Sequence, residues 1–394
     1  MTRASYPLRQ AQIVDTIGLH SSMDSNNQGM ARALAAGGWM PFVVSNYLDR
    51  EFANPRALEL PNFYRGRNWS SLRLLLRAAL AFSGYVRAVD NPNTLWLLHN
   101  YGLRLTDMIF LGLLWGRRRR TILVIHDVLS LHNREPMLIA AFKAWIYRQI
   151  QAGLIVHSTA AADHLRSLGY QGPMTKVDLF RTFVTPVVPG REETMSASLA
   201  PALGDRSRIR MLLFGSIRRS KGTDIALAAM RALTPEQRRH CLLVIAGRDG
   251  DGLLGTPGHE IPDDGSVVVL DRFISNEERT ALFAEADFLL LPYREVYQSG
   301  VLEVAVAQRA RVLASSITSF DQFFAAYPSF GSTYGFDQDS LRKAIVGAIQ
   351  GELPGGKVPY KEEERSRYEA EDPLTVLVPR LQEMLKESGN SFAG

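Results

Sequence analysis

Short apolar runs alternate with longer stretches of helical period along most of the chain. In residues 1–185 the short runs that predict strands are Gln12–Leu19, Pro41–Ser45, Thr94–Leu98, Thr121–Ile125 and Gly153–His157. The stretches that predict helices are Gln28–Ala36, Ser70–Val89, Leu103–Leu114 and Leu138–Gln151. Strands that alternate with helices in this way are typical of an α/β protein with a parallel sheet.

The same alternation restarts after residue 206. Strands are predicted at Met211–Phe214, Cys241–Ala246, Val267–Leu270, Phe288–Pro292 and Arg311–Ser315, and helices at Thr223–Arg231, Asn276–Ala286 and Gly300–Ala307. Between the halves, residues 185–206 are rich in Pro, Ser, Ala and charge without a sustained period, which indicates a linker. We therefore expect two doubly wound sheets with a cleft between them. An amphipathic helix, Pro373–Leu385, follows the charged run Lys361–Arg367, which we interpret as a solvated face.

The composition narrows the class of protein. Of 394 residues, 46% are hydrophobic and 22% are charged, which excludes collagen-like, coiled-coil and wholly disordered chains. The single cysteine, Cys241, excludes an internal disulfide and a zinc site of several thiolates. The first residues lack the apolar core of a signal peptide, and no apolar run approaches the roughly 20 residues that a membrane-spanning helix needs. These patterns predict a soluble, cytoplasmic protein.

Charge is divided unevenly between the halves. Residues 1–190 hold 21 Lys and Arg against 11 Asp and Glu, a balance of +10, whereas the remainder carries −5. Residues 65–87 hold five arginines and no acidic residue, with apolar residues at roughly helical spacing, and Arg117–Arg120 adds four more cations. This pattern fits a basic amphipathic helix on an anionic membrane, and it equally fits a packed surface helix whose leucines face the sheet. No recognisable nucleic-acid module is present, so nucleic acid is not an expected partner.

The segment from Leu213 to Asp224 reads as a strand, a turn and the start of a helix. Gly215 permits a tight turn at the end of the strand, and Arg218 and Lys221 follow in the loop. Two cations beside a helix N-terminus suit a diphosphate. The alternative is an ordinary basic surface loop.

The segment from Leu290 to Glu303 has the same layout. Glu295 lies in a polar loop after the strand, and Glu303 falls about one turn into the next helix. Glu303 would accept hydrogen bonds from a vicinal diol such as ribose, and Glu295 would reach a second group. The N–H groups near Gly300 and Val301 would bind phosphate. The alternative is that both glutamates face solvent.

In the first half, His126 and Asp127 stand at the carboxyl end of a predicted strand. Residues at that place in a parallel sheet are candidates for a ligand site. His126 would donate a hydrogen bond to a substrate hydroxyl or stabilise a leaving phosphate, unless it is a structural histidine. His20, His99 and Asn100 also follow apolar strands and are weaker candidates on the acceptor side.

Asp249-Gly250-Asp251 follows another predicted strand, and Asp-x-Asp motifs can bind a nucleotide-bound cation. Three glycines surround this motif, so we interpret it as a solvated turn and expect no metal site.

Taken in order, these segments resemble the retaining glycosyltransferases of GT-B fold, family 4. The resemblance covers nearly the whole chain. The most specific elements are the turn from Gly215 to Gly222 and the pair Glu295 and Glu303, separated by seven residues. Phe283–Tyr293 resembles the usual lead-in to that pair, and Gln298–Val301 resembles a branch that builds bacterial exopolysaccharides and lipid-linked sugars.

The resemblance implies an organisation and a set of roles. It implies two Rossmann-like domains facing a cleft: an acceptor-binding domain (1–185), a linker (186–206), a nucleotide-sugar-binding domain (207–372) and a C-terminal helix (373–394) that crosses back to the first domain. Lys221 and Arg218 would bind the diphosphate of the donor, Glu303 the ribose and Glu295 the transferred sugar. The other implied site residues are Gly215, Ser216, Ser299, Gly300 and Val301 around the donor, Arg272 and Phe273 near the base, and His126 beside the reacting sugar. His20, His99, Asn100 and Asp127 would lie on the acceptor side.

Two departures from the family pattern concern this set. Ser216 stands where many members have an arginine, so that Arg218 would take the role of that arginine. The segment Ser22–Gly29 supplies a single glycine where a glycine-rich loop is expected.

We therefore hypothesise a metal-independent transferase without cofactor that moves a sugar from a UDP- or GDP-sugar to an acceptor hydroxyl. The acceptor would be a lipid-linked oligosaccharide at the inner face of the plasma membrane. Two alternatives stay open: a non-catalytic nucleotide-sugar-binding or scaffold protein, and a glycoside hydrolase with Glu295 and Glu303 as its carboxylate pair.

Overall fold

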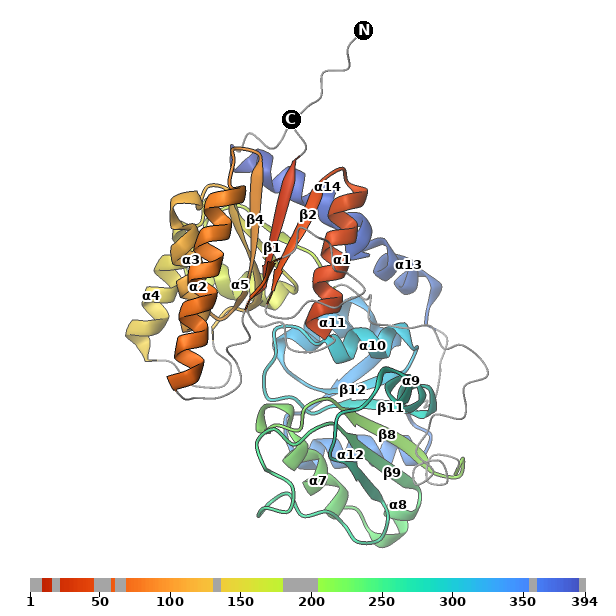
Figure 1. The fold of residues 1–394 in the computed structure, drawn as a ribbon. Helices are drawn as coiled ribbons and strands as arrows, with labels where there is room; N and C mark the ends of the chain where they lie inside the picture. Colours follow the sequence, from red (N-terminus) through yellow and green to blue (C-terminus); the bar gives the residue numbers. More distant parts are fainter. Residues whose placement is uncertain are drawn as a thin grey trace. The chain divides into compact units, whose positions relative to one another are not determined.

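The computed structural model describes residues 9–15, 22–45, 58–60, 69–129, 136–179, 205–353 and 360–389. They form two compact units, one comprising Met1–Phe183 with Glu369–Gly394 and the other Val184–Tyr368 (Figure 1). We call them the N-terminal unit and the C-terminal unit. Most of the segment that we interpreted as a linker lies outside the described residues. Within the described ranges, none of the helices combines the length and the apolar character that crossing a bilayer needs.

The N-terminal unit is built on a parallel sheet with strand order β3-β2-β1-β4-β5-β6-β7. Its strands are β1 (Gln10–Asp15), β2 (Met40–Ser45), β3 (Leu58–Glu59), β4 (Thr94–Tyr101), β5 (Thr121–Asp127), β6 (Leu154–Val156) and β7 (Met174–Lys176). Its helices are α1 (Ser22–Ala36), α2 (Trp69–Val89), α3 (Leu105–Leu114), α4 (Met137–Gln149), α5 (Thr159–Ser167) and α14 (Pro373–Glu387). The strand order reverses at β1, as in doubly wound folds.

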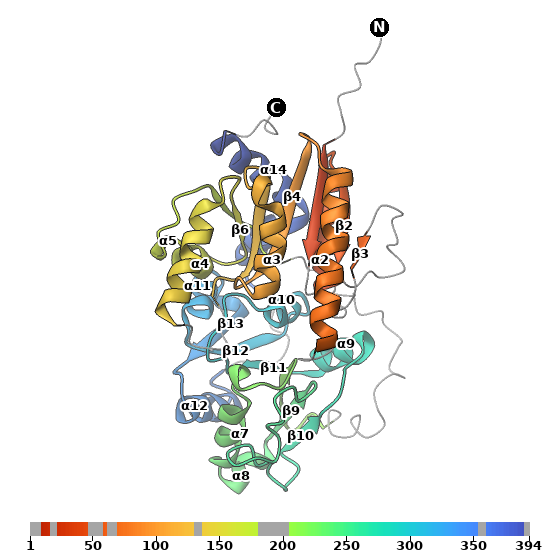
Figure 2. The same ribbon diagram turned by 60° about the vertical axis from the view of Figure 1, so that its left-hand side comes forward.

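Helices cover both faces of this sheet. On one face, α1 and α14 pack on β1, β4 and β5, where Leu34, Leu377 and Leu381 are fully buried with Leu97. On the other face lie α2, α3 and α4 (Figure 2). There the ring of Phe82 packs edge-on against Trp96 of β4, at a centroid distance of 6.0 Å. The last helix of the chain is therefore part of the core of the N-terminal unit.

The C-terminal unit has a second parallel sheet with order β10-β9-β8-β11-β12-β13. Its strands are β8 (Ile209–Phe214), β9 (Cys241–Ala246), β10 (Val267–Leu270), β11 (Phe288–Leu291), β12 (Arg311–Ser315) and β13 (Gly331–Tyr334). Its helices are α7 (Thr223–Arg231), α8 (Pro235–Arg239), α9 (Asn276–Glu285), α10 (Gly300–Ala307), α11 (Thr318–Ala326), α12 (Gln338–Ile349) and α13 (Glu362–Ala370). The order reverses between β8 and β11, so the loops after these two strands diverge at the place where such sheets bind ligands.

The charged run 361–367 is not simply a solvated face, as we had expected. Most of it lies in α13, where Glu364 is buried and accepts hydrogen bonds from the amide and the hydroxyl of Ser329, both at 2.8 Å. Tyr368 on the same helix is buried as well. One side of α13 thus packs inward despite its charge.

Candidate functional site

The turn after β8 is shaped by two glycines in left-handed backbone conformations. Gly215 has φ +108° and Gly222 has φ +68°. A Cβ atom at Gly222 would stand 1.8 Å from the carbonyl oxygen of Pro292, so only glycine fits there. The chain after β8 therefore packs directly on the chain after β11, which holds the two sequence-predicted segments together.

Two cations project from this turn. Arg218 is exposed, and its Nε donates a hydrogen bond of 3.2 Å to the hydroxyl of Ser216. Lys221 ends a short 3₁₀ turn, Arg219–Lys221, and its Nζ stands 3.7 Å from the ring centroid of the buried Tyr293. Tyr293 begins the loop after β11, so the Lys221 ammonium is held where the two loops meet.

Arg294 joins the same two loops through polar contacts. Its guanidinium donates to both carboxylate oxygens of Asp224, at 2.8 and 2.5 Å, and to the carbonyl of Arg219. Its own amide donates to the carbonyl of Ser220, at 2.9 Å. A bidentate pair of this kind fixes geometry as well as charge. Nothing in the sequence marks Arg294 or Asp224, because the two lie 70 residues apart.

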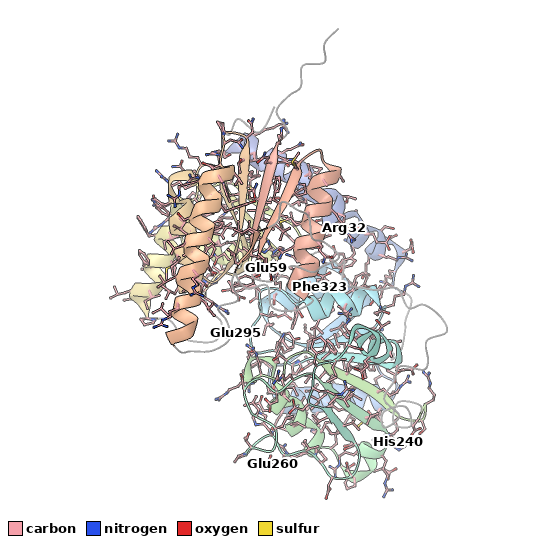
Figure 3. All side chains as sticks on the ribbon, viewed as in Figure 1. Arg32, Glu59, His240, Glu260, Glu295 and Phe323 are labelled. Carbon is pink, nitrogen blue, oxygen red and sulfur yellow. The ribbon has the colours of Figure 1, made fainter. Side chains whose placement is uncertain are left out.

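Glu295 lies in the loop after β11 and is exposed (Figure 3). Partial loss of water nevertheless raises the pKa of its carboxyl above the ordinary value. In Figure 3, Glu295 and His240 mark opposite ends of the sheet: Glu295 follows the carboxyl end of β11 and His240 precedes the amino end of β9.

The N-terminus of α10 lies beside the turn after β8. A Cβ at Gly215 would stand 3.7 Å from Cγ2 of Val301, the second residue of α10. Ser299 caps the helix by accepting the amide of Leu302, at 3.2 Å. The first amides of a helix have no partner within the helix, which makes those of Gly300 and Val301 candidates to bind a ligand.

Glu303 lies in the first turn of α10, as predicted. Its carboxylate accepts a hydrogen bond from the hydroxyl of Tyr368 on α13. The turn after β8 and the start of α10 thus bring together Gly215, Ser216, Arg218, Lys221, Ser299, Gly300, Val301 and Glu303 at one end of the sheet.

Arg272 and Phe273 follow β10, which is an edge strand separated from β8 by β9. The guanidinium of Arg272 is paired with Glu278, at 2.8 and 2.6 Å, whereas 67% of Phe273 is exposed. The Phe273 ring is therefore accessible for stacking with a nucleotide base. The positive charge of Arg272 is neutralised by Glu278 of the same unit.

The carboxylates of Asp249 and Asp251 fold a turn. Asp249 accepts the amide of Leu254, at 2.9 Å, and Asp251 accepts that of Arg219, at 3.2 Å. In the part of the chain that the structure describes, no group of three or more His, Cys, Asp or Glu side chains is placed to hold a metal ion.

In the N-terminal unit, β4 and β5 are longer than predicted. The apolar runs end at Leu98 and Ile125, but the strands continue to Tyr101 and Asp127. His99 and Asn100 therefore lie inside β4 and are fully buried, rather than following it. The expectation that they stand beyond a strand is wrong, because buried polar side chains that bond one another can extend a strand. His20 lies outside the described residues.

These side chains form a buried polar cluster. Nδ1 of His99 and Nε2 of His126 share a hydrogen bond of 2.7 Å, and the His126 ring stacks on Tyr101 at a centroid distance of 4.6 Å. The ring of His157, after β6, lies 4.9 Å from that of His126. The ladder between β4 and β5 shifts register here, which leaves His126 without an opposite residue on β4.

The cluster is neutral at pH 7. Burial lowers the pKa of His99 and His126, and it lowers that of His157 to about 4. Nδ1 of His157 donates to the carbonyl of Val177, at 2.7 Å. His126 itself is only 3% exposed, so its assignment beside a reacting sugar stays a prediction.

Asn100 and Asp15 complete the surroundings of the cluster. The side-chain Nδ2 of Asn100 donates to the hydroxyl of Tyr147, at 3.0 Å. Its side-chain Oδ1 accepts a hydrogen bond from the backbone amide of Leu103, at 2.7 Å. Asp15, which no sequence pattern marked, accepts from the hydroxyl of Tyr101 at 3.1 Å. Asp127 is half-buried at the end of β5.

No protein-family model matches the sequence, and no curated protein matches it. Solved structures do match. A UDP-forming α,α-trehalose-phosphate synthase from Burkholderia xenovorans, in complex with glucose-6-phosphate, is 12% identical with a TM-score of 0.64, covering 96% of this chain and 100% of that one. WaaG, a glycosyltransferase involved in lipopolysaccharide biosynthesis, is 14% identical with a TM-score of 0.62, covering 98% and 100%. Sucrose-phosphate synthase from Thermosynechococcus elongatus is 16% identical with a TM-score of 0.60, covering 96% and 95%.

At these identities the likeness concerns the fold. It confirms the predicted α/β class with two Rossmann-like units, as in GT-B glycosyltransferases.

Proposed function

We propose that the protein is a retaining, metal-independent glycosyltransferase that moves a sugar from a UDP- or GDP-sugar to an acceptor hydroxyl. The observation that carries this proposal is the packing of the turn after β8 on the loop after β11. It sets Lys221 against Tyr293, and the Gly215 turn lies against the Val301 side chain at the start of α10. Cations and free amides at the reversal point of a parallel sheet are what a diphosphate requires.

The chemistry follows from the charge that develops as the bond breaks. When the bond between sugar and phosphate lengthens, negative charge builds on the departing diphosphate and positive charge on the sugar. Lys221, Arg218 and the amides of α10 would stabilise the diphosphate electrostatically without a bound metal. Glu303 would hold the ribose and Glu295 the transferred sugar. The retaining outcome rests on the resemblance to family 4.

We propose a lipid-linked glycan of exopolysaccharide synthesis as the acceptor, at the cytoplasmic face of the membrane. The uneven charge, the arginine-rich α2 and the resemblance of Gln298–Val301 to that branch of the family support this choice. Acceptor recognition would belong to the N-terminal unit, at the carboxyl ends of β4 and β5, where the half-buried Asp127 lies.

The test is a panel of UDP-, GDP- and ADP-sugars, with binding measured by thermal shift and turnover by release of the nucleoside diphosphate. Lys221→Ala is expected to lower turnover about 100-fold or more, as removal of one transition-state contact does elsewhere. Glu303→Gln should weaken binding of the same donor. Arg219→Ala is the matched control, because Arg219 is an exposed arginine of the same turn.

The outcomes separate the alternatives. Unchanged turnover in both Lys221→Ala and Glu303→Gln would overturn the site. Binding of a nucleotide sugar without turnover would favour a non-catalytic protein, and cleavage of glycosides without a nucleotide would favour a hydrolase.

A further inference from the structure

Three helices of the N-terminal unit leave an unusual number of apolar side chains exposed. Of the thirteen large apolar side chains that are exposed in the described part of the chain, nine belong to α2, α3 and α4. We call these nine the apolar helix face: Leu72, Leu76, Leu80, Leu105, Met137, Leu138, Ile139, Phe142 and Trp145. Single exposed leucines are ordinary, but a group of this size marks an interaction surface.

The nine side chains share one side of the N-terminal unit. α2, α3 and α4 lie on the same face of its sheet (Figures 1 and 2). The rings of Phe82 on α2 and Phe110 on α3 are 4.8 Å apart, and those of Trp115, just after α3, and Trp145 on α4 are 6.1 Å apart. The exposed side chains of neighbouring helices thus form one surface.

Part of the apolar helix face lies at the carboxyl edge of the sheet. β4 and β5 end at that edge, so α3 and α4, which follow them, begin there. α2 precedes β4 and therefore begins at the same edge. Leu105, Met137 and Leu138 stand in the first turns of α3 and α4, and 82% and 81% of Met137 and Leu138 are exposed.

The exposed charged side chains of α2 and α4 are all positive. Neither α2 nor α4 contains an acidic residue. Arg73, Arg77 and Arg148 are exposed and have no ion pair within the described residues. By contrast, Arg117 and Arg120, the first and last of the four consecutive arginines after α3, are bonded to Asp90 at 2.7 and 3.1 Å. Arg73, Arg77 and Arg148 therefore place unpaired positive charge on the helices that carry most of the apolar helix face.

We propose that the apolar helix face docks on an anionic lipid bilayer. Its aliphatic and aromatic side chains would enter the acyl region, while Arg73, Arg77 and Arg148 meet lipid phosphates. A bilayer fits better than a protein partner because the exposed residues of α4 are apolar or arginine, with no acidic or neutral polar group to direct hydrogen bonds. This inference names the surface that would bring a membrane acceptor to the N-terminal unit, and it does not depend on transferase activity.

The experiment measures binding of the full chain to vesicles of phosphatidylcholine, alone or mixed with phosphatidylglycerol, by co-sedimentation. Leu138→Ser combined with Phe142→Ser is expected to weaken binding to mixed vesicles at least tenfold. Arg73→Gln combined with Arg77→Gln should remove most of the preference for phosphatidylglycerol. Ile261→Ser combined with Phe336→Ser is the control, since both are exposed apolar residues of the C-terminal unit.

Trp145 gives a second readout. Its emission should shift to the blue with mixed vesicles, and Trp145→Phe should abolish the shift. Failure of the wild-type chain to bind mixed vesicles, or equal weakening by the Ile261/Phe336 control, overturns the proposal. A wild-type dimer that Leu138→Ser/Phe142→Ser dissociates would overturn it too and assign the face to a second copy.

A separate observation concerns Glu303 and rests on the proposed function. The Tyr368 ring is packed among Phe330, Tyr327 and Phe323, with centroids 5.4, 5.5 and 6.3 Å away, and its hydroxyl is bonded to Glu303. The aromatic neighbours pack against the ring, and the hydroxyl bonds the carboxylate. We infer that Tyr368 is a positioning residue that aims Glu303 at the ribose of the donor.

Tyr368→Phe tests this inference because it keeps the ring and removes only the hydroxyl. We expect the preference for UDP over 2′-deoxy-UDP, or for GDP over its 2′-deoxy form, to fall at least threefold in this variant. Tyr360→Phe is the control: Tyr360 packs on the same Phe330 ring, but its hydroxyl donates to the carbonyl of Ala310. An unchanged preference in Tyr368→Phe overturns the positioning role alone. A wild-type chain that binds none of these nucleotides overturns the proposed function with it.

Discussion

In the N-terminal unit the polar side chains at the ends of β4 and β5 are buried and bonded to one another, whereas in the C-terminal unit they lie on loops beyond the strands. His99 is hydrogen-bonded to His126, the His126 ring stacks on Tyr101, and all three side chains are buried. Arg218 and Glu295 are exposed, and Lys221 stands half-exposed between two loops. The same edge of a parallel sheet thus carries buried polar side chains in one unit and accessible ones in the other, depending on whether the residue lies inside the strand or after it.

The sharpest test of the loop arrangement is Gly222→Ala. The new Cβ would meet the carbonyl oxygen of Pro292 at 1.8 Å, and φ is +68°. We expect the C-terminal unit to lose about 3 kcal/mol of stability and the affinity for nucleotide to fall with it. Gly252→Ala is the control, because Gly252 has φ +64° with nothing within 4 Å, so about 1 kcal/mol is expected.

The chain carries natural probes that separate the units. Cys241, the only cysteine, is buried in the C-terminal unit, so its reaction with a thiol reagent reports unfolding there. The five tryptophans all belong to the N-terminal unit, so their fluorescence reports on that unit. Equal destabilisation by Gly222→Ala and Gly252→Ala would contradict the contact between the loops.

We expect low pH to destabilise the N-terminal unit. The pKa of His157 is about 4 in the folded protein against an ordinary 6.5, so the unfolded chain takes up a proton in this range that the folded chain does not. Unfolding is therefore favoured as pH falls from 6.5 to 4, by about 3 kcal/mol from His157. His99 and His126 shift in the same direction. Asp107 opposes them, because burial raises its pKa to about 6 and the folded form then binds the proton more tightly.

Acid titration followed by tryptophan fluorescence checks this expectation. His157→Gln cannot take up the proton, and its amide can still donate to Val177, so the unfolding midpoint should move to lower pH. Asp107→Asn removes the opposing group and should move it to higher pH. The asparagine oxygen can still accept the amides of Tyr101 and Arg104, which both bond one carboxylate oxygen. A midpoint that neither variant moves would show that the cluster does not control acid stability.

The smallest expected effect comes from the pair of Arg294 and Asp224. Asp224→Asn should cost about 1 kcal/mol, because both side chains are partly exposed, and should weaken nucleotide binding a few-fold by loosening the two loops. The matched control is Asp339→Asn, which breaks a surface pair with Arg342 on α12. That change should leave nucleotide binding unaltered. If Asp224→Asn does the same, the two loops keep their arrangement without the ion pair.

Much of the C-terminal unit could be predicted from the sequence. The predicted bounds of α7, β9, β10, α10 and β12 agree with the structure to the residue, because short apolar runs between glycine, proline and polar turns leave few alternatives. The polar ends of β4 and β5 could not be predicted, since burial of His99 and Asn100 depends on partners from other strands. The contacts of Arg294 and Tyr368 could not be predicted for the same reason, because their partners lie 70 and 65 residues away in the sequence.

The place of α14 has a consequence for how the protein is made. Leu377, Leu381 and Leu385 fill the core of the N-terminal unit, although they are among the last residues of the sequence given. During synthesis the ribosome delivers the whole C-terminal unit before these leucines. The C-terminal unit can therefore finish folding before the final helix of the N-terminal unit has been synthesised. A nascent chain halted before α14 would expose the apolar surface that α14 covers, and chaperones could bind it.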